Sequence, residues 1–306
     1  MGIDARTKEI IKTMRTGIMG PFWPTPANLS TPLEKCAYLV RETHALGCRC
    51  IHLSMIEHTP EFLAAFAEIL NEHDMEIDGP ASGTFQILEK GKEAREMLAT
   101  CCRSVKALGG NIVRGGYGTL RIEKSRFNKS IAISDHLKIL EGNLREAAKI
   151  MEDEDCYLAI ENHCDFKGVE LASVLEAVGS KRVGCALDTA NAWTVLCDPE
   201  DDIAALAKYA ITTHMKDMKI LQQNIPSRIP FYPIGCVLGE GFVRVKDSIL
   251  TLAEQSPFAE GLHLIIELGW MEYGTSPNQE QRDALQIDVF KRSLKNLDQM
   301  LAELTA

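Results

Sequence analysis

Short apolar runs alternate along the chain with longer segments of helical periodicity, and this alternation constrains the fold more than any other feature. Between the runs, apolar residues recur every three or four positions, as in PEFLAAFAEILNEH (60–73), which is typical of helices. Eight runs are strand-like: 16–20, 48–55, 75–82, 111–118, 156–164, 183–191, 210–218 and 262–270.

Alternating strands and helices predict parallel strands joined by helical crossovers. Eight such units over about 250 residues fit one α/β domain, a (β/α)8 TIM barrel that spans residues 1–306. A doubly wound open sheet is the alternative. Its nucleotide-binding motif is absent, because the glycines of GGNIVRGGYG (109–118) flank a strand and do not open a helix.

Two strand-to-strand intervals, from 111 to 156 and from 210 to 262, are much longer than the others. We therefore expect long loops at about 115–135 and 218–241. Both would follow the C-terminal ends of strands, where barrel active sites are built. They are either lids that exclude water or simple surface excursions.

Composition and the apolar runs disfavour several classes of protein. A net charge of −10 disfavours binding to nucleic acid. The first 17 residues lack the apolar core of a secretory signal, and no run reaches the roughly 18 apolar residues of a membrane helix. The ten cysteines lack zinc-site spacing. We expect reduced cysteines in a cytoplasmic protein with neither nucleic-acid nor membrane partners.

One acidic or imidazole side chain lies near the end of each of the last four strands, namely Glu161, Asp188, His214 and Glu267. Adjacent strands are about 4.8 Å apart, so these groups would converge at the barrel mouth. Three carboxylates so close would raise one another's pKa unless a cation lay among them. The pattern predicts one divalent metal ion bound by all four, preferably Mn²⁺, with Mg²⁺ or Co²⁺ as alternatives. Taken singly, each acid would more often be a helix cap.

Further candidates surround the predicted ligands. Alternate residues of a strand point the same way, so His163 and Lys216 share the inward sides of the ligands in their strands. We predict catalytic roles for both, besides Glu161 and Glu267. Alternatively, His163 is a hydrogen-bonded histidine in the wall of the barrel. For Lys216 the alternative is only a structural ion pair with Asp217 or Asp188. Three tryptophans follow strands one, six and eight, namely Trp23, Trp193 and Trp270. We predict that they contact the C–H faces of a sugar, and the alternative is that they only pack against the protein.

The pattern resembles the xylose isomerase-like TIM barrels, a superfamily of sugar isomerases and epimerases that also includes inosose dehydratases and endonuclease IV. The resemblance covers essentially the whole chain. It places the metal ligands on the same four residues and makes Glu240 a pocket-edge residue. The motifs that carry it are IENH (160–163), LDTAN (187–191), HMKD (214–217), LGEGFVRVKDSIL (238–250) and IIELGW (265–270).

Departures from the family pattern indicate which branch of the family the chain resembles most. Ketose 3-epimerases usually carry a substrate-contacting histidine where this chain has Asn191, and an arginine soon after the strand-seven histidine, where Lys216 and Asp217 stand. The HxKD motif (214–217) is more similar to that of the family members that act on inososes and keto-sugars. Endonuclease IV needs several more histidines for its zinc ions, which disfavours a DNA enzyme.

The resemblance and the site chemistry together predict an isomerase or epimerase of a sugar or keto-polyol, acting by proton transfer through a metal-bound enediolate. The alternative is a metal-dependent lyase or dehydratase that uses β-elimination on a keto-sugar or 3-keto-glycoside. A catalytically silent sugar-binding protein is a third reading. The expected partner is a small carbohydrate. Barrels of the resembling family commonly form dimers, so a homo-oligomer is also expected.

Overall fold

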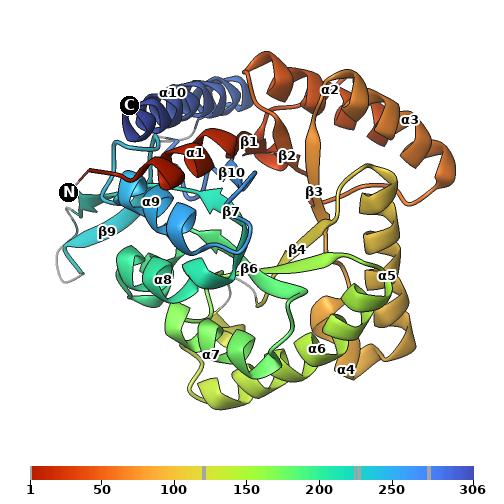
Figure 1. Cartoon of the computed structure of the whole chain (residues 1–306). Coiled ribbons are helices and arrows are strands. Elements are labelled where there is room, and N and C mark those ends of the chain that lie inside the picture. Colours follow the sequence, from red (N-terminus) through yellow and green to blue (C-terminus); the bar gives the residue numbers. More distant parts are fainter. Residues whose placement is uncertain (1, 119–121, 224, 226–228, 274–276) are drawn as a thin grey trace.

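The computed structural model describes residues 2–118, 122–223, 225, 229–273 and 277–306. Eight parallel strands close a barrel in the order β1-β10-β7-β6-β5-β4-β3-β2 (Figure 1). Each overlaps one predicted run, so the predicted (β/α)8 barrel is confirmed. The barrel strands are β1 (Arg15–Met19), β2 (Cys50–His52), β3 (Glu76–Pro80), β4 (Ile112–Gly116), β5 (Tyr157–Glu161), β6 (Val183–Asp188), β7 (Ala210–Met215) and β10 (His263–Ile266).

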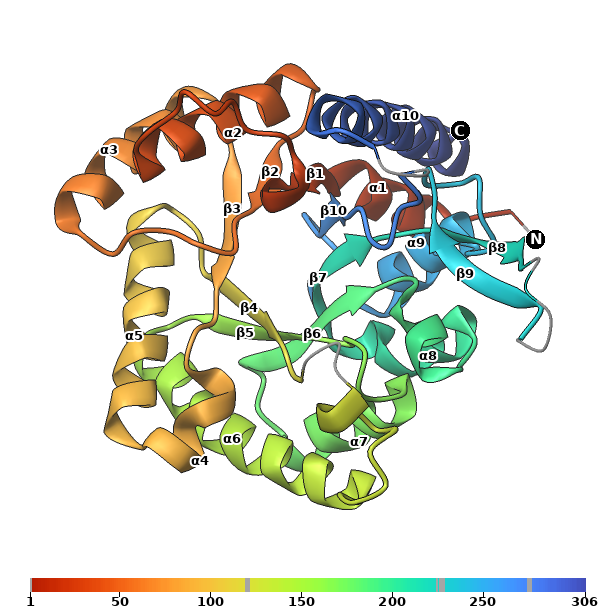
Figure 2. The same cartoon turned by 180° about the vertical axis from the view of Figure 1, so that it is seen from behind.

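Helices surround the barrel (Figure 2). Two of them, α2 and α10, begin at capping boxes, whose N-cap residues are Thr31 and Asn278. In the described part of the chain, no helix is long and apolar enough to cross a membrane. The helices are α1 (Ala5–Thr13), α2 (Pro32–Ala45), α3 (Pro60–Glu72), α4 (Ile87–Lys90), α5 (Lys92–Ala107), α6 (Ile133–Asp153), α7 (Gly168–Val178), α8 (Pro199–Leu206), α9 (Val245–Gln255) and α10 (Gln279–Thr305).

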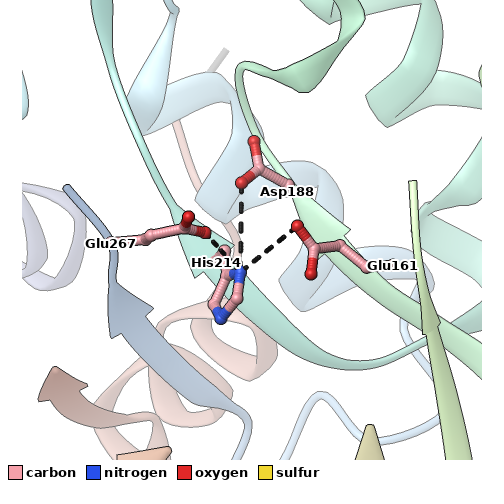
Figure 3. Close-up of side chains that lie close together, drawn as sticks. All are labelled: Glu161, Asp188, His214 and Glu267. Atoms are coloured by element: carbon pink, nitrogen blue, oxygen red, sulfur yellow. Dashed lines mark ion pairs between the residues drawn. The ribbon is translucent and has the colours of Figure 1, made fainter. Parts of the chain in front are cut away.

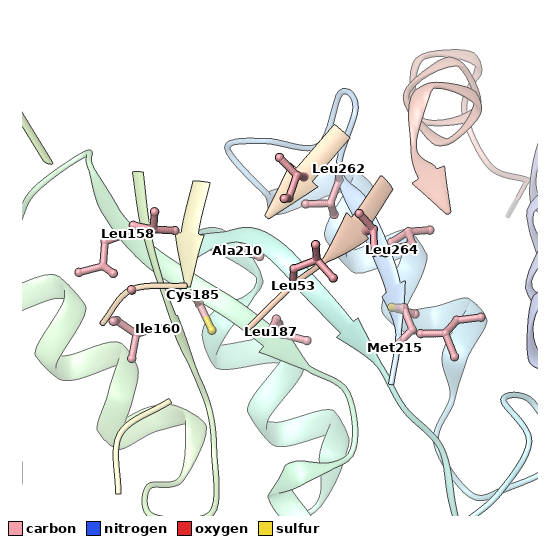
Figure 4. Packing of buried hydrophobic residues seen from close by; sticks show 14 of the residues in the cluster. Leu53, Leu158, Ile160, Cys185, Leu187, Ala210, Met215, Leu262 and Leu264 are labelled. Carbon is pink, nitrogen blue, oxygen red and sulfur yellow. The ribbon is translucent and has the colours of Figure 1, made fainter. Parts of the chain in front are cut away.

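The main apolar core lies between the strands and this shell of helices (Figure 4). Leu158 and Ile160 of β5 belong to it and are fully buried. Burial of one such side chain contributes roughly 1.5–3 kcal/mol. Ala159, between them, belongs to a separate small cluster with residues of β4, β6 and β7. Alternation along β5 therefore leaves Glu161, two positions beyond Ala159, on the side away from the main core.

A charged layer fills the barrel interior next to that small cluster. His263 Nδ1 lies 2.8 Å from Asp78 Oδ1, and its Nε2 lies 2.7 Å from Glu76 Oε2. Thr212 donates a hydrogen bond of 2.6 Å to Asp78 Oδ2. Burial opposes a charge on His263, but the two carboxylates outweigh it and raise its pKa to about 9. His263 is therefore protonated at neutral pH.

The raised pKa of His263 predicts a pH-dependent stability. The histidine binds its proton more tightly in the folded chain, so its contribution is fully present below its unfolded pKa of about 6.5 and is lost as the pH rises through 9. We expect the free energy of unfolding to fall by on the order of 3 kcal/mol over that window. Urea titrations between pH 6 and 10 measure it. His263→Gln should remove most of this slope, and an unchanged slope in that variant would assign it to other groups.

The second predicted loop contains secondary structure that the sequence analysis missed. Within 218–241, β8 (Met218–Gln222) and β9 (Phe231–Gly235) form an antiparallel hairpin beside the barrel (Figure 2). Pro233 is tolerated because an edge strand leaves half of its N–H groups unpaired. In the first predicted loop, Arg126 binds Glu170 at 2.7 Å, which ties the loop to α7. Residues 119–121, 224 and 226–228 of the two loops lie outside the described residues.

Candidate metal centre

The four predicted ligands come from four neighbouring strands and meet at one point (Figure 3). Glu161 and Asp188 end β5 and β6, His214 lies near the end of β7, and Glu267 directly follows β10. Strand register aligns Asp188 with His214. One potential ligand atom from each residue lies within 4.8 Å of all the others.

Three buried polar atoms of this group have only ionic contacts within the cluster and no hydrogen bond of regular geometry to a described residue, namely His214 Nδ1, Asp188 Oδ2 and Glu267 Oε2. His214 Nδ1 lies 2.5 Å from Glu267 Oε2, 3.6 Å from Glu161 Oε1 and 4.0 Å from Asp188 Oδ2. Buried polar atoms rarely lack partners. Carboxylate oxygens and one imidazole nitrogen suit Mg²⁺, Mn²⁺ or Co²⁺. The residues present therefore fit a divalent ion.

Electrostatics keep the group anionic. Burial opposes a charge on Glu267, but the ammonium of Lys216 and the imidazole of His214 lower its pKa to about 2. Burial likewise opposes a charge on Glu161, and His214 outweighs it and lowers the pKa of that carboxyl. For Asp188 burial prevails and raises the pKa. A cation among these groups would favour the ionised form of all three.

Lys216 lies inside the same cluster. Its Nζ is 2.9 Å from Asp188 Oδ2, 3.2 Å from Glu267 Oε1 and 3.1 Å from the side-chain oxygen of Asn191. The Trp270 ring covers the ammonium at 4.6 Å. Burial disfavours its charge, but the surrounding carboxylates raise the pKa of Lys216 above its usual value. A permanently charged ammonium cannot act as a base, but it can stabilise an oxyanion.

Asp217 points away from this cluster although it is the next residue. Its carboxylate accepts hydrogen bonds from four backbone N–H groups, at Met218 (2.8 Å), Gly239 (2.9 Å), Gly241 (2.9 Å) and Val243 (3.0 Å). A Cβ at position 241 would lie 2.2 Å from Asp217 Oδ1, so only glycine fits there. The aspartate of HMKD thus fixes the GEGFV loop and forms no ion pair with Lys216.

His52 of β2 is a site residue that sequence reasoning missed. It is buried, and its Nδ1 lies 3.2 Å from His214 Nε2. Burial and the nearby charge of Arg114 lower the pKa of His52 well below its usual value. A neutral His52 can accept a hydrogen bond from the Nε2–H of His214, which orients His214 Nδ1 toward the carboxylates, where a metal ion would bind it. The one sequence signal was a histidine at the end of strand two.

This contact predicts a role for His52 in metal binding. His52→Leu removes the acceptor that orients His214, so we expect metal affinity to fall about 10- to 100-fold. Competition with a fluorescent chelator measures the affinity. His44→Leu, which changes a histidine on α2 outside the barrel, is the control and should bind metal normally. Equal affinity in both variants would remove His52 from the site.

The other predicted residues are distributed around the centre. Asn191 donates a 3.0 Å hydrogen bond to Glu161 Oε1 and so bridges this carboxylate to Lys216. His163 is half-buried, and its Nδ1 has no hydrogen bond within the described chain. Its side chain lies beside Gly116, where a Cβ would approach it to 3.3 Å.

Among the tryptophans, Trp270 alone is seen to contact a residue of the centre. Trp193 packs beside Phe242, with ring centroids 6.4 Å apart. Trp23 is buried against Phe290 of α10 at 5.7 Å. Glu240 lies on the surface and pairs with Arg292 of α10, so the structure does not bring it to the four ligands.

Comparison with known proteins supplies the family. The family model described as xylose isomerase-like TIM barrel matches residues 40–294, most of the chain. The chain belongs to this family. A search of curated proteins found no match.

Solved structures of other xylose isomerase-like barrels superpose along almost the entire length of the chain. A structure of L-ribulose 3-epimerase has 16% identity and a TM-score of 0.68, and covers 95% of both chains. A xylose isomerase-like TIM barrel protein from Mycobacterium smegmatis, in complex with magnesium, has 14% identity and a TM-score of 0.67, and covers 97% of this chain and 99% of its own. D-allulose 3-epimerase from Methylomonas sp., in complex with D-allulose, has 14% identity and a TM-score of 0.64, and covers 94% and 97%. At such identities the likeness establishes the fold.

Proposed function

We propose that this family member is a divalent-metal-dependent isomerase or epimerase of a sugar or keto-polyol. The observation that carries the proposal is the convergence of three carboxylates and one imidazole, with ligand atoms within 4.8 Å of one another, at the end of a barrel. The sugar epimerases among its structural neighbours, one of them in complex with D-allulose, support a carbohydrate substrate.

Glu161, Asp188, His214 and Glu267 would hold the ion. When bound, such an ion acts as a Lewis acid that polarises a carbonyl and acidifies the adjacent C–H. The two glutamates flank the centre, because β6 and β7 lie between β5 and β10. One carboxylate removes the proton from one face of the substrate. The other, after it has taken up a proton from solvent, returns that proton from the opposite face, which inverts the carbon.

The neighbouring residues prepare this proton transfer. Asn191 fixes Glu161 through a 3.0 Å hydrogen bond, which limits the carboxylate's rotation. Lys216 donates to the negative oxygen that develops when the substrate loses its proton. Trp270 covers Lys216 and restricts the access of water to this side of the site. His163, on the same side of its strand as Glu161, is our second candidate for a proton carrier.

Proton NMR in D2O tests the proposal. The purified protein, loaded in turn with Mn²⁺, Mg²⁺ and Co²⁺, is incubated with a panel of ketoses, inososes and keto sugar acids. Deuterium at the carbon next to the carbonyl, together with a new epimer or isomer, is the expected result. Loss of water or of an aglycone would instead indicate the lyase alternative. The absence of exchange with every metal and substrate, together with unchanged sugars, would overturn the proposal.

Metal identity, cytoplasmic location and self-association stay predictions. Elemental analysis of protein purified without chelators would identify the native ion, for which we expect Mn²⁺. The ten cysteines are free in the structure, and their reduced state stays a prediction as well.

A further inference from the structure

Arg114 of β4 extends across the barrel interior toward the metal centre. Its Nη1 donates a 3.4 Å hydrogen bond to the backbone carbonyl of Thr213 on β7, the residue before His214. In the barrel, β5 and β6 separate β4 from β7. The guanidinium therefore spans the interior and reaches the strand that carries the imidazole ligand.

One edge of this guanidinium has no partner. Nε and Nη2 of Arg114 are buried without a hydrogen bond to any described residue, and only 1% of the side chain is exposed. A buried N–H group without a partner is costly, the more so when it carries charge. The Nε–Nη2 edge presents two parallel N–H donors, the geometry that binds a carboxylate through both oxygens.

The carboxylates around Arg114 do not form a close ion pair with it. Asp78 lies 4.0 Å from it and also faces the protonated His263 at 2.8 Å. Arg114 is also close enough to Glu161 to help lower the pKa of that carboxyl. A divalent ion and the ammonium of Lys216 would together balance the three carboxylates of the metal centre. Arg114 would then face the negative charge that His263 leaves unmatched on Asp78 and Glu76, but only through its Nη1 side. No carboxylate of the described chain binds its Nε–Nη2 edge, which is free to bind an anionic group.

A cavity of about 270 Å³ gives a ligand access to this region. It opens at the ends of β2, β3 and β4, and its lining includes Ser54, Ser82, Gln86, Arg114 and Gly116. Gly116 aligns with Glu161 across the β4–β5 pair. The cavity lining contains none of the four ligands, but it includes the residue paired with Glu161 on the neighbouring strand.

We propose that Arg114 binds a carboxylate of the substrate, so that the enzyme acts on a keto sugar acid and not on a neutral ketose. The inference rests on the proposed function, because it assigns the substrate class of the same centre. The reacting carbon lies between the two glutamates, and the acid group extends toward β4. Ser54, Ser82 and Gln86 offer hydrogen bonds to the hydroxyl groups in between.

Calorimetric binding to the Mn²⁺-loaded protein tests the proposal without requiring turnover. The probes are 2-keto-D-gluconate and D-fructuronate, which carry the acid at opposite ends, with D-fructose as the neutral match. We expect at least one acid to bind about 10- to 100-fold more tightly than fructose. Arg114→Met should abolish this preference, and Arg114→Lys should restore part of it as a single ammonium donor.

Controls separate this inference from the proposed function. Arg95→Gln removes a surface charge that pairs with Glu146 on α6 and should bind the acids normally. Circular dichroism and metal content identify variants that fail to fold or to bind metal. If Arg114→Met is such a variant, the comparison is made between Arg114→Lys and the unsubstituted protein. Acids that bind no better than fructose, or a preference that survives in Arg114→Met because the carboxylate ligates the metal, would overturn the inference. Deuterium exchange into neutral ketoses would still leave the proposed function standing.

Discussion

Glu267→Gln is expected to lower kcat by about 10³-fold while the barrel stays folded. The amide keeps the size of the side chain but cannot take up a proton, and general base catalysis contributes about 10²- to 10⁴-fold. Glu267 is ionised at neutral pH, since its pKa is lowered to about 2 by Lys216 and His214 against the effect of burial. It also follows β10 at the C-terminal end of the barrel, where residues serve function more than stability.

The measurement is the rate of deuterium incorporation with the best substrate of the panel, at saturating metal. Glu146→Gln on α6 is the matched control and should keep full activity, because its carboxylate lies in a surface ion pair. Circular dichroism checks the fold of both variants. Activity of Glu267→Gln within threefold of the unsubstituted enzyme would exclude Glu267 as the base. Metal content must be reported alongside, because Glu267 is also a ligand in our proposal.

His214→Ala is expected to reduce metal affinity by at least about a hundredfold, since loss of an orienting contact alone costs 10- to 100-fold. The imidazole is the one nitrogen donor of the group, and its Nδ1 faces all three carboxylates. Removing it leaves three acids without the partner that offsets part of their repulsion.

Elemental analysis after dialysis against a chelator-buffered metal solution measures the occupancy. His44→Ala provides a control outside the barrel. Unchanged occupancy in His214→Ala would remove His214 from the ligands. A loss of metal with an intact fold would support the ligand set independently of any assay for turnover.

The barrel and the convergence of four polar groups could be predicted because both follow from local rules. Strand periodicity places alternate residues on one side, and the order of parallel strands brings their C-terminal ends together. Glu161, Asp188, His214 and Glu267 each lie at the end of a recognisable apolar run, so their meeting required no knowledge of side-chain packing.

Contacts between distant segments could not be predicted in the same way. His52 and Arg114 reach His214 and Thr213 from strands in the first half of the chain, and no local pattern distinguishes them from other buried polar residues. The position of Glu240 depends on Arg292 of α10, and the β8–β9 hairpin depends on pairing within a segment that looked like a loop.

The opposite orientations of Lys216 and Asp217 have a consequence for engineering. Lys216, whose ammonium lies among the acids, and Asp217, whose carboxylate fixes residues 239–243, are consecutive in the chain. Shortening or grafting that segment would shift the anchoring carboxylate, and the backbone would carry the displacement to the ammonium beside it. Libraries that aim at new substrates should therefore keep both glycines of GEG and diversify the exposed side chains between and after them.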